Sequence, residues 1–188
     1  MVTIPTLIFP IVLATVLVWV ASALIWTVLP WHKKDFAGLP DEASALAALK
    51  PQNLAPGQYA LPHITSQAQM KEAAVRQKFE EGPAGFMTVL PRGVPAMGKA
   101  MVLSVVFYLV VSVAVAYLAS RTLTAGADYM AVFQITATVA WLTYGAATIP
   151  DAIWFGRPWS SILKGLWDAF IYALLTAGAF SGLWPEAV

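Results

Sequence analysis

The stretch "AMVLSVVFYLVVSVAVAYLAS", residues 100–120, decides the fold, because it contains no charged side chain over its whole length. An α-helix needs about 20 apolar residues to cross the hydrocarbon core of a bilayer. The stretch therefore predicts a transmembrane helix, and we interpret the chain around it as an integral membrane protein.

The composition of the whole chain agrees with this interpretation. Of its 188 residues, 59% are hydrophobic and only 11% are charged, whereas soluble domains have about 25% charged residues. The net charge of +1 gives no basic field for phosphates, which argues against nucleic acid as a partner. The chain has no cysteine, which excludes disulfides, thiolate metal sites and cysteine nucleophiles.

Three further apolar runs are long enough to span a membrane, and each is bounded by proline, which ends helices. They are residues 6–29, 129–149 and 161–184. The first run is too long for the 7–15-residue core of a cleaved signal peptide, so we expect a retained helix. The predicted fold class is an all-α membrane protein with four transmembrane helices in a bundle.

The polar residues gather in one insert between the first two spans. We predict transmembrane helix 1 in residues 1–31, the insert in residues 32–97, and a membrane domain with the other three helices in residues 98–188. Within the insert, turn and capping residues predict a helix over 39–52, a strand over 57–64, a helix over 66–81 and a strand over 85–91. This small mixed α/β insert cannot build much core alone, so we expect it to pack on the membrane domain.

Lysine and arginine are distributed unevenly between the two sides of the predicted helices. Only Arg121 lies on the side of the termini, and ten basic residues lie on the other: Lys33, Lys34, Lys50, Lys71, Arg76, Lys78, Arg92, Lys99, Arg157 and Lys164. Basic residues near helix ends favour the cytoplasm. We therefore expect a cytoplasmic insert and both termini outside. The lack of cysteine and the compact loops are typical of a bacterial inner membrane.

The stretch "IPDAIWFGRPWSSILKGLWDAF", residues 149–170, places two acids and two bases among apolar neighbours. Asp168 lies about two turns inside the fourth span, where an unpaired carboxylate is costly. Lys164 lies one turn earlier on the same face, and Asp151 and Arg157 lie on the preceding loop. We expect these four charges to neutralise one another and to fasten the third loop to the fourth helix.

Two functional uses of this region remain open. The first is a basic, aromatic site for anionic lipid headgroups, because basic clusters at the inner leaflet bind them; its members would be His32, Lys33, Lys34, Trp154, Arg157, Trp159 and Lys164. The second is a proton or ion relay through Asp168. No other carboxylate lies inside the first three spans, which counts against a carboxylate-based pump.

Other polar and small residues predict helix contacts rather than chemistry. Gly178 and Gly182 form a G-x-x-x-G pattern, which allows helices to approach closely within the bundle or in a homo-oligomer. Gln134 lies inside the third span and should face another helix or a cavity. The histidines lack metal-ligand spacing, and "GVPAMGKA" lacks the hydroxyl residue of a phosphate-binding loop. No cofactor and no metal site are predicted.

Three functional hypotheses follow. We favour a non-catalytic accessory, scaffold or lipid-interacting protein that meets a protein partner through residues 32–97, because no convergent catalytic set is evident. An alternative is a small oligomeric transporter or channel that uses Gln134 and Asp168. Another is a membrane enzyme acting on a lipid phosphate, with His32, Arg157 and Lys164 holding phosphate and Asp151 or Asp168 as the base.

Overall fold

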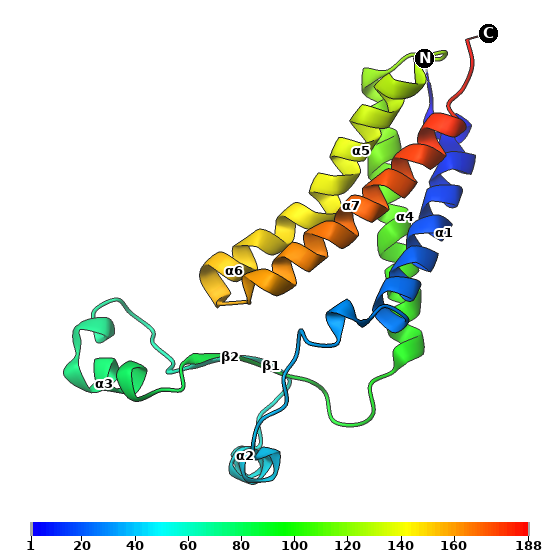
Figure 1. The fold of residues 1–188 in the computed structure, drawn as a ribbon. Helices are drawn as coiled ribbons and strands as arrows, with labels where there is room; N and C mark the ends of the chain where they lie inside the picture. Colours follow the sequence, from blue (N-terminus) through cyan, green and yellow to red (C-terminus); the bar gives the residue numbers. More distant parts are fainter. Residues whose placement is uncertain (1, 188) are drawn as a thin grey trace. The chain divides into compact units, whose positions relative to one another are not determined.

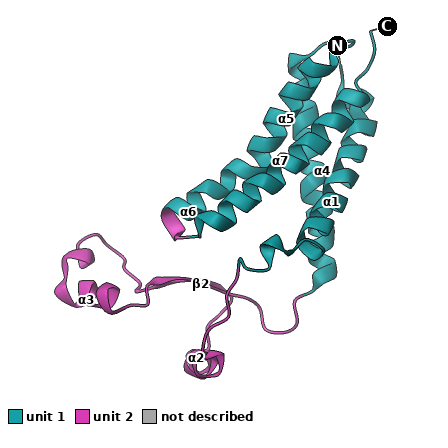
Figure 2. Ribbon diagram, in the orientation of Figure 1, with its two compact units in different colours: residues 1–35, 96–153, 157–188 teal, residues 36–95, 154–156 magenta. Residues whose placement is uncertain are grey.

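The computed structural model describes residues 2–187 and divides into two compact units (Figure 2). Unit 1 comprises residues 1–35, 96–153 and 157–188, and unit 2 comprises residues 36–95 and 154–156. Residues 32–35, which were expected to belong to the insert, are part of unit 1. This difference matters because these residues contribute to the site described below.

Four helices are long and apolar enough to cross a membrane, as the sequence predicts. They are α1 (Ile8–Thr27) with the preceding 3₁₀ turn η1 (Ile4–Leu7), α4 (Met97–Thr122), α5 (Tyr129–Gly145) and α7 (Trp159–Gly182). The third span does not stop at Pro150, because a 3₁₀ turn η5 (Ala146–Thr148) leads into α6 (Ile149–Phe155). Pro150 lies in the first turn of α6, where its missing N–H is not needed.

The four long helices pack side by side in unit 1 (Figure 1). α5 packs along α7, α1 packs against both α4 and α7, and α4 also packs against α5. Leu7, Val115 and Phe180 are almost completely buried in the main apolar core. The outward faces of the helices are also apolar, with many exposed Leu, Val and Phe side chains. This distribution suits helices surrounded by lipid.

The segment after α7 is fastened to the turn between α4 and α5. The indole N–H of Trp184 donates to the carbonyl of Thr124 at 2.9 Å, and the backbone N–H of Gly126 donates to the carbonyl of Pro185 at 2.8 Å. Gly126 has φ of +74°, a conformation that glycine adopts without strain. α5 then begins with Asp128, whose side chain accepts a hydrogen bond from the N–H of Met130.

Unit 2 contains the two helices and two strands in the predicted order. α2 (Glu42–Leu49) begins at Asp41, which caps it by accepting from the N–H of Ser44 at 3.0 Å. β1 (Gly57–Leu61) pairs antiparallel with β2 (Gly85–Val89), with Gly57 opposite Val89. Between the strands lie a 3₁₀ turn η4 (Gln69–Lys71) and α3 (Ala73–Glu81). α3 is shorter than the predicted helix over 66–81, because Glu72 is extended and separates it from η4.

α5 and α7 approach each other closely at Gly145. A Cβ at this position would lie 2.9 Å from Leu166 Cδ2 and 3.0 Å from Ala169 Cβ. Gly178 and Gly182, in contrast, have no such neighbour within 4 Å. The expected helix contact through the G-x-x-x-G pattern within the chain is therefore wrong, and its use in a homo-oligomer stays a prediction.

The contact at Gly145 generates a stability prediction. Gly145→Val should destabilise unit 1 by about 1–3 kcal/mol, because the added atoms overpack the α5–α7 contact. Gly178→Val is the matched control, since it introduces the same side chain on a helix without this clash. Thermal unfolding of both variants in detergent, followed by circular dichroism, measures the difference. Equal melting temperatures for the two variants would contradict the close approach.

Candidate functional site: a buried imidazole and carboxylate cluster

His32 is a buried histidine held between aromatic rings at the end of α1. The chain leaves α1 and turns through η2 (Pro30–His32), which brings the imidazole back against the helix. The ring stacks on Trp26 with centroids 4.0 Å apart and planes 8° apart, and Trp31 packs edge-on at 6.2 Å. Only 7% of His32 is exposed. The structure thus places His32 in the interior, and its predicted part in a lipid headgroup site stays a prediction.

Both ring nitrogens of His32 face carboxylates. Nδ1 lies 2.6 Å from Asp35 Oδ2, and Nε2 lies 2.9 Å from Asp168 Oδ2. A neutral imidazole can donate from one nitrogen only. Two hydrogen bonds to carboxylates therefore need one additional proton, carried either by the imidazole or by one of the acids.

Lys164 completes the cluster on the more exposed side. Its ammonium group donates to Asp35 Oδ1 at 2.5 Å and to the carbonyl of Trp31 at 2.6 Å. With a protonated imidazole, the two cations and the two carboxylates of Lys164, His32, Asp35 and Asp168 sum to zero charge. Neutrality is what burial of charged groups requires.

Asp35 is the acid that joins Lys164 to His32. Hydrogen bonds from Lys164 and then from His32 lower the pKa of its carboxyl from 3.8 to about 2. Its side chain is 6% exposed, so both interactions are shielded from water. Asp35 therefore remains ionised at neutral pH and fixes the positions of Lys164 and His32.

The four charges of residues 149–170 do not form the single mutually neutralising set that the sequence predicted. Asp151 and Arg157 make their own pair at 3.6 Å, with side chains almost half exposed. Lys164 and Asp168 instead pair with Asp35 and His32, which are 129 and 136 residues away in sequence. Lys164 and Asp168 on α7 are thus paired with the segment after α1, and Asp151 and Arg157 are paired with each other.

The remaining predicted site residues have exposed side chains. Lys33, Lys34 and Trp159 are exposed, and Trp154 is exposed within unit 2. Gln134 is exposed on α5, so it does not face the interior with Asp168, contrary to expectation. The exposed indoles and lysines remain available to lipid headgroups, but His32 and Lys164 are engaged with carboxylates.

Asp35, a member of the cluster, and Tyr172, one turn beyond Asp168, were missed in the sequence. Asp35 follows His32 by three residues, a spacing that allows an i, i+3 contact across a turn, and this was the available signal. Tyr172 follows Asp168 by four residues and continues the same face of α7. Neither signal identifies the partner on the other segment, because that depends on how α1 and α7 pack.

The cluster is not arranged to hold a metal ion. The two carboxylates bind opposite nitrogens of the imidazole ring, so the ring stands between them and the three groups do not converge on one point. Among residues 2–187, no group of three or more His, Cys, Asp or Glu residues could hold a metal ion.

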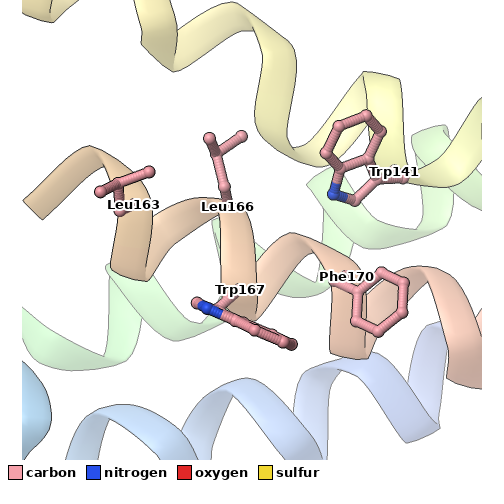
Figure 3. Close-up of a pocket in the computed structure, with 5 residues that line it drawn as sticks. All are labelled: Trp141, Leu163, Leu166, Trp167 and Phe170. Carbon is pink, nitrogen blue, oxygen red and sulfur yellow. The ribbon is translucent and has the colours of Figure 1, made fainter. Parts of the chain in front are cut away.

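An apolar groove opens on unit 1 between α5 and α7 (Figure 3). Its volume is about 240 Å³, and its lining contains only apolar and aromatic side chains: Trp141, Leu163, Leu166, Trp167 and Phe170. Trp141 comes from α5 and the other four come from α7. Such a lining suits an acyl chain and supplies no group for acid–base or nucleophilic chemistry.

Comparisons of this chain with protein-family models, with curated proteins and with solved structures find no match.

The ion pairs of Asp35 generate a prediction about pH. A carboxyl whose pKa falls on folding stabilises the protein above its unfolded pKa, and this stabilisation is lost as the pH falls from about 4 to about 2. Asp35→Asn should therefore be less stable than the parent at neutral pH, by about 1.5–3 kcal/mol. The difference should shrink across this acidic range. Melting temperatures measured in detergent against pH test it.

Asp151→Asn is the matched control for this experiment, because it removes the acid of an exposed ion pair, which contributes about 0–1 kcal/mol. A parent and an Asp35→Asn variant that differ equally at pH 7 and at pH 2 would contradict the assigned ion pairs.

Proposed function

We propose that this chain is a non-catalytic, membrane-embedded subunit of a protein complex. It would bind its protein partner through residues 36–95, hereafter the arm. The observation that carries this proposal is that the arm has helices and paired strands but no buried residue. Its exposed large apolar side chains are Phe36, Leu39, Leu46, Leu61, Met70, Phe79, Phe86, Leu90 and Val94.

An ordered segment without a core needs another surface to cover it. Phe36 is 84% exposed and Val94 is 94% exposed, and burial of apolar area contributes about 25 cal/mol per Å². A segment of this size buries too little surface to be stable by itself. Contiguous exposed apolar side chains are typical of protein interaction sites.

The charge of the arm favours a protein over an anionic membrane surface as its partner. The arm has five basic residues, Lys50, Lys71, Arg76, Lys78 and Arg92, and five acidic residues, Asp41, Glu42, Glu72, Glu80 and Glu81. Its formal net charge is therefore zero. Attraction to anionic lipid needs an excess of basic residues, each contributing about 1 kcal/mol.

A groove in the arm supports a helical or extended partner segment. It has a volume of about 1020 Å³ and lies beside α2 and β2. Its apolar lining includes Leu46, Leu54 and Met87, and the basic side chains Lys50 and Arg92 also line it. Arg92 donates to Asn53 Oδ1 at 3.1 Å, which joins the two sides of the groove. An amphipathic helix with an acidic edge is the complementary ligand.

In this proposal, the four helices serve as the anchor of the arm in the membrane. The pairing of His32 and Lys164 with carboxylates favours an anchoring role over the lipid-phosphate enzyme, because neither cation is left for phosphate. The groove between α5 and α7 suits a membrane lipid. We further propose a bacterial inner membrane, with a cytoplasmic arm and both termini outside, on the distribution of Lys and Arg.

Native mass spectrometry of the protein, extracted gently from its own membrane, tests the proposal. We expect a partner protein in a fixed stoichiometry. Leu46→Glu should reduce the occupancy of this partner at least about tenfold, which corresponds to about 1.4 kcal/mol, because it places a carboxylate on the apolar lining of the groove. The melting temperature of the helices should not change.

Leu39→Glu is the matched control, since Leu39 is equally exposed but does not line the groove. It should retain the partner. A bare monomer, a species with lipid only, or a partner retained equally by both variants would contradict the proposal. A homo-oligomer lost in Leu46→Glu would identify the partner as a second copy of this chain.

A further inference from the structure

The interior of unit 1 contains polar atoms that are buried without a hydrogen-bond partner in residues 2–187. They are Asp168 Oδ1, the hydroxyls of Tyr144 and Tyr172, and the hydroxyls of Thr176 and Ser181. A buried polar group without a partner destabilises the folded chain, because it has lost its hydrogen bonds to water. Something polar therefore has to satisfy them.

Most of these groups follow one face of α7 inward from the cluster. Asp168, Tyr172 and Thr176 are spaced by four residues, so each lies one turn beyond the last, about 6 Å along the helix. The ring of Tyr172 lies 5.7 Å from the ring of Tyr144 on α5. Asp168, Tyr172, Tyr144 and Thr176 thus contribute unpartnered atoms to the same part of the interior, next to the cluster.

The other helices also contribute to this region. The ring of Tyr108 on α4 lies 6.0 Å from Tyr172. Ser112 on α4 accepts a hydrogen bond from Thr15 on α1 at 3.3 Å. The side chains of Ser112 and Thr176 lie near the hydroxyl of Tyr144, but in a geometry that makes no direct hydrogen bond. Hydroxyls that are close but not bonded to one another are typical binding sites for bridging water.

We propose that His32 and Asp168 form a binding site for one exchangeable proton, and that water held by the hydroxyls of Tyr172, Tyr144 and Thr176 extends this site into the interior of unit 1. The ligands are a proton and neutral water. The proton is shared between His32 Nε2 and Asp168 Oδ2, and its release leaves a net charge of −1 on the four charged residues. Asp168 Oδ1, which has no partner, accepts from the first water.

The site opens on one side only. Lys164, at the outer edge of the cluster, has a side chain that is 29% exposed, so water reaches the proton from there. Toward the opposite end of the helices, Leu7 and Phe180 are fully buried and Ile11 is 4% exposed. This apolar packing closes the far end, so the region binds a proton from one face of the membrane and is not an open pore.

The groups that govern this proton come from every element around His32. Asp35, on the segment after η2, and Lys164 and Asp168, on α7, are the charged ones in contact with the cluster. Tyr172 on α7, Tyr108 on α4 and Tyr144 on α5 are the titratable groups next to Asp168 and to one another. Loss of the charge on Asp168 therefore removes half of the carboxylate environment that favours a protonated imidazole.

Trp26 offers a direct signal for this proton, because its indole stacks on His32 and a protonated imidazole quenches indole fluorescence. The difference in fluorescence between the parent and Trp26→Phe, measured against pH in neutral phosphatidylcholine vesicles, isolates this indole. Because the site binds one proton, we expect this difference to change in one step across the measured pH range. Asp168→Asn should lower its midpoint by at least about one pH unit, since an opposite charge at this distance favours the protonated form.

Asp151→Asn is the control for this shift, because Asp151 pairs with Arg157 outside the cluster; its midpoint should match the parent. A fluorescence difference that stays constant over this pH range overturns the exchangeable proton. An equal midpoint in the parent and in a folded Asp168→Asn variant overturns the role of Asp168.

Radiolytic footprinting of the parent protein tests the water independently of any variant at Asp168. Radicals formed from bound internal water modify the side chains beside it. We expect Tyr172 and Tyr144 to be modified at rates comparable with exposed Tyr129 and well above buried Phe180. Rates as low as that of Phe180 overturn the hydrated interior.

A matched pair of variants refines this measurement. Tyr172→Phe removes the hydroxyl and keeps the ring, so loss of bound water should lower the modification of Tyr144. Tyr117→Phe removes an exposed hydroxyl on α4 and should leave Tyr144 unchanged. Equal modification of Tyr144 in both variants overturns the assignment of this water to Tyr172.

Discussion

The pairing of His32 with Asp168 is the interaction on which the arrangement of unit 1 depends. A carboxylate two turns inside a membrane span is costly unless a polar partner reaches it, and the partner of Asp168 is His32, on the segment that follows the first span. The chain after α1 therefore has to turn back onto α7. Stacking on Trp26 and the ion pairs of Asp35 hold it there, which explains why the side chains of His32 and Asp35 are buried although they are polar.

This pairing also connects the membrane unit to the arm. Asp35 is the last residue of unit 1 before the arm begins at Phe36. One carboxylate oxygen of Asp35 pairs with His32 and the other with Lys164. These polar interactions, rather than apolar packing, hold the chain at the point where it leaves the helices. A fixed starting point for the arm favours the binding of a partner, because less conformational freedom is then lost on binding.

The fold could be predicted much further from the sequence than the site. The spans and the elements of the insert depend on local patterns, namely apolar run length, prolines and capping residues such as Asp41. The structure has these elements in the predicted order, but α3 begins only at Ala73 and the third span continues through α6. The charge pairs could not be predicted in the same way. Lys164 and Asp168 share a face at i, i+4 spacing, and sequence reasoning paired them. The partners that prevail, Asp35 and His32, lie more than a hundred residues away and become neighbours only through the packing of α1 on α7. The contact at Gly145 likewise depends on tertiary packing.

No carboxylate lies inside the first three predicted spans, but the proposed proton site uses hydroxyls and water in place of a second carboxylate. A second buried carboxylate would add a desolvation penalty of several kcal/mol, whereas hydroxyls and water are neutral and need only hydrogen bonds to be buried. A chain with one charged cluster near the membrane border can therefore extend a proton site inward at low cost through Tyr and Thr. Tyr172, Tyr144 and Thr176 have this position and no protein partner within residues 2–187. In a membrane interior, the residues that identify such a site are the unpartnered hydroxyls, because the charges alone mark only its entrance.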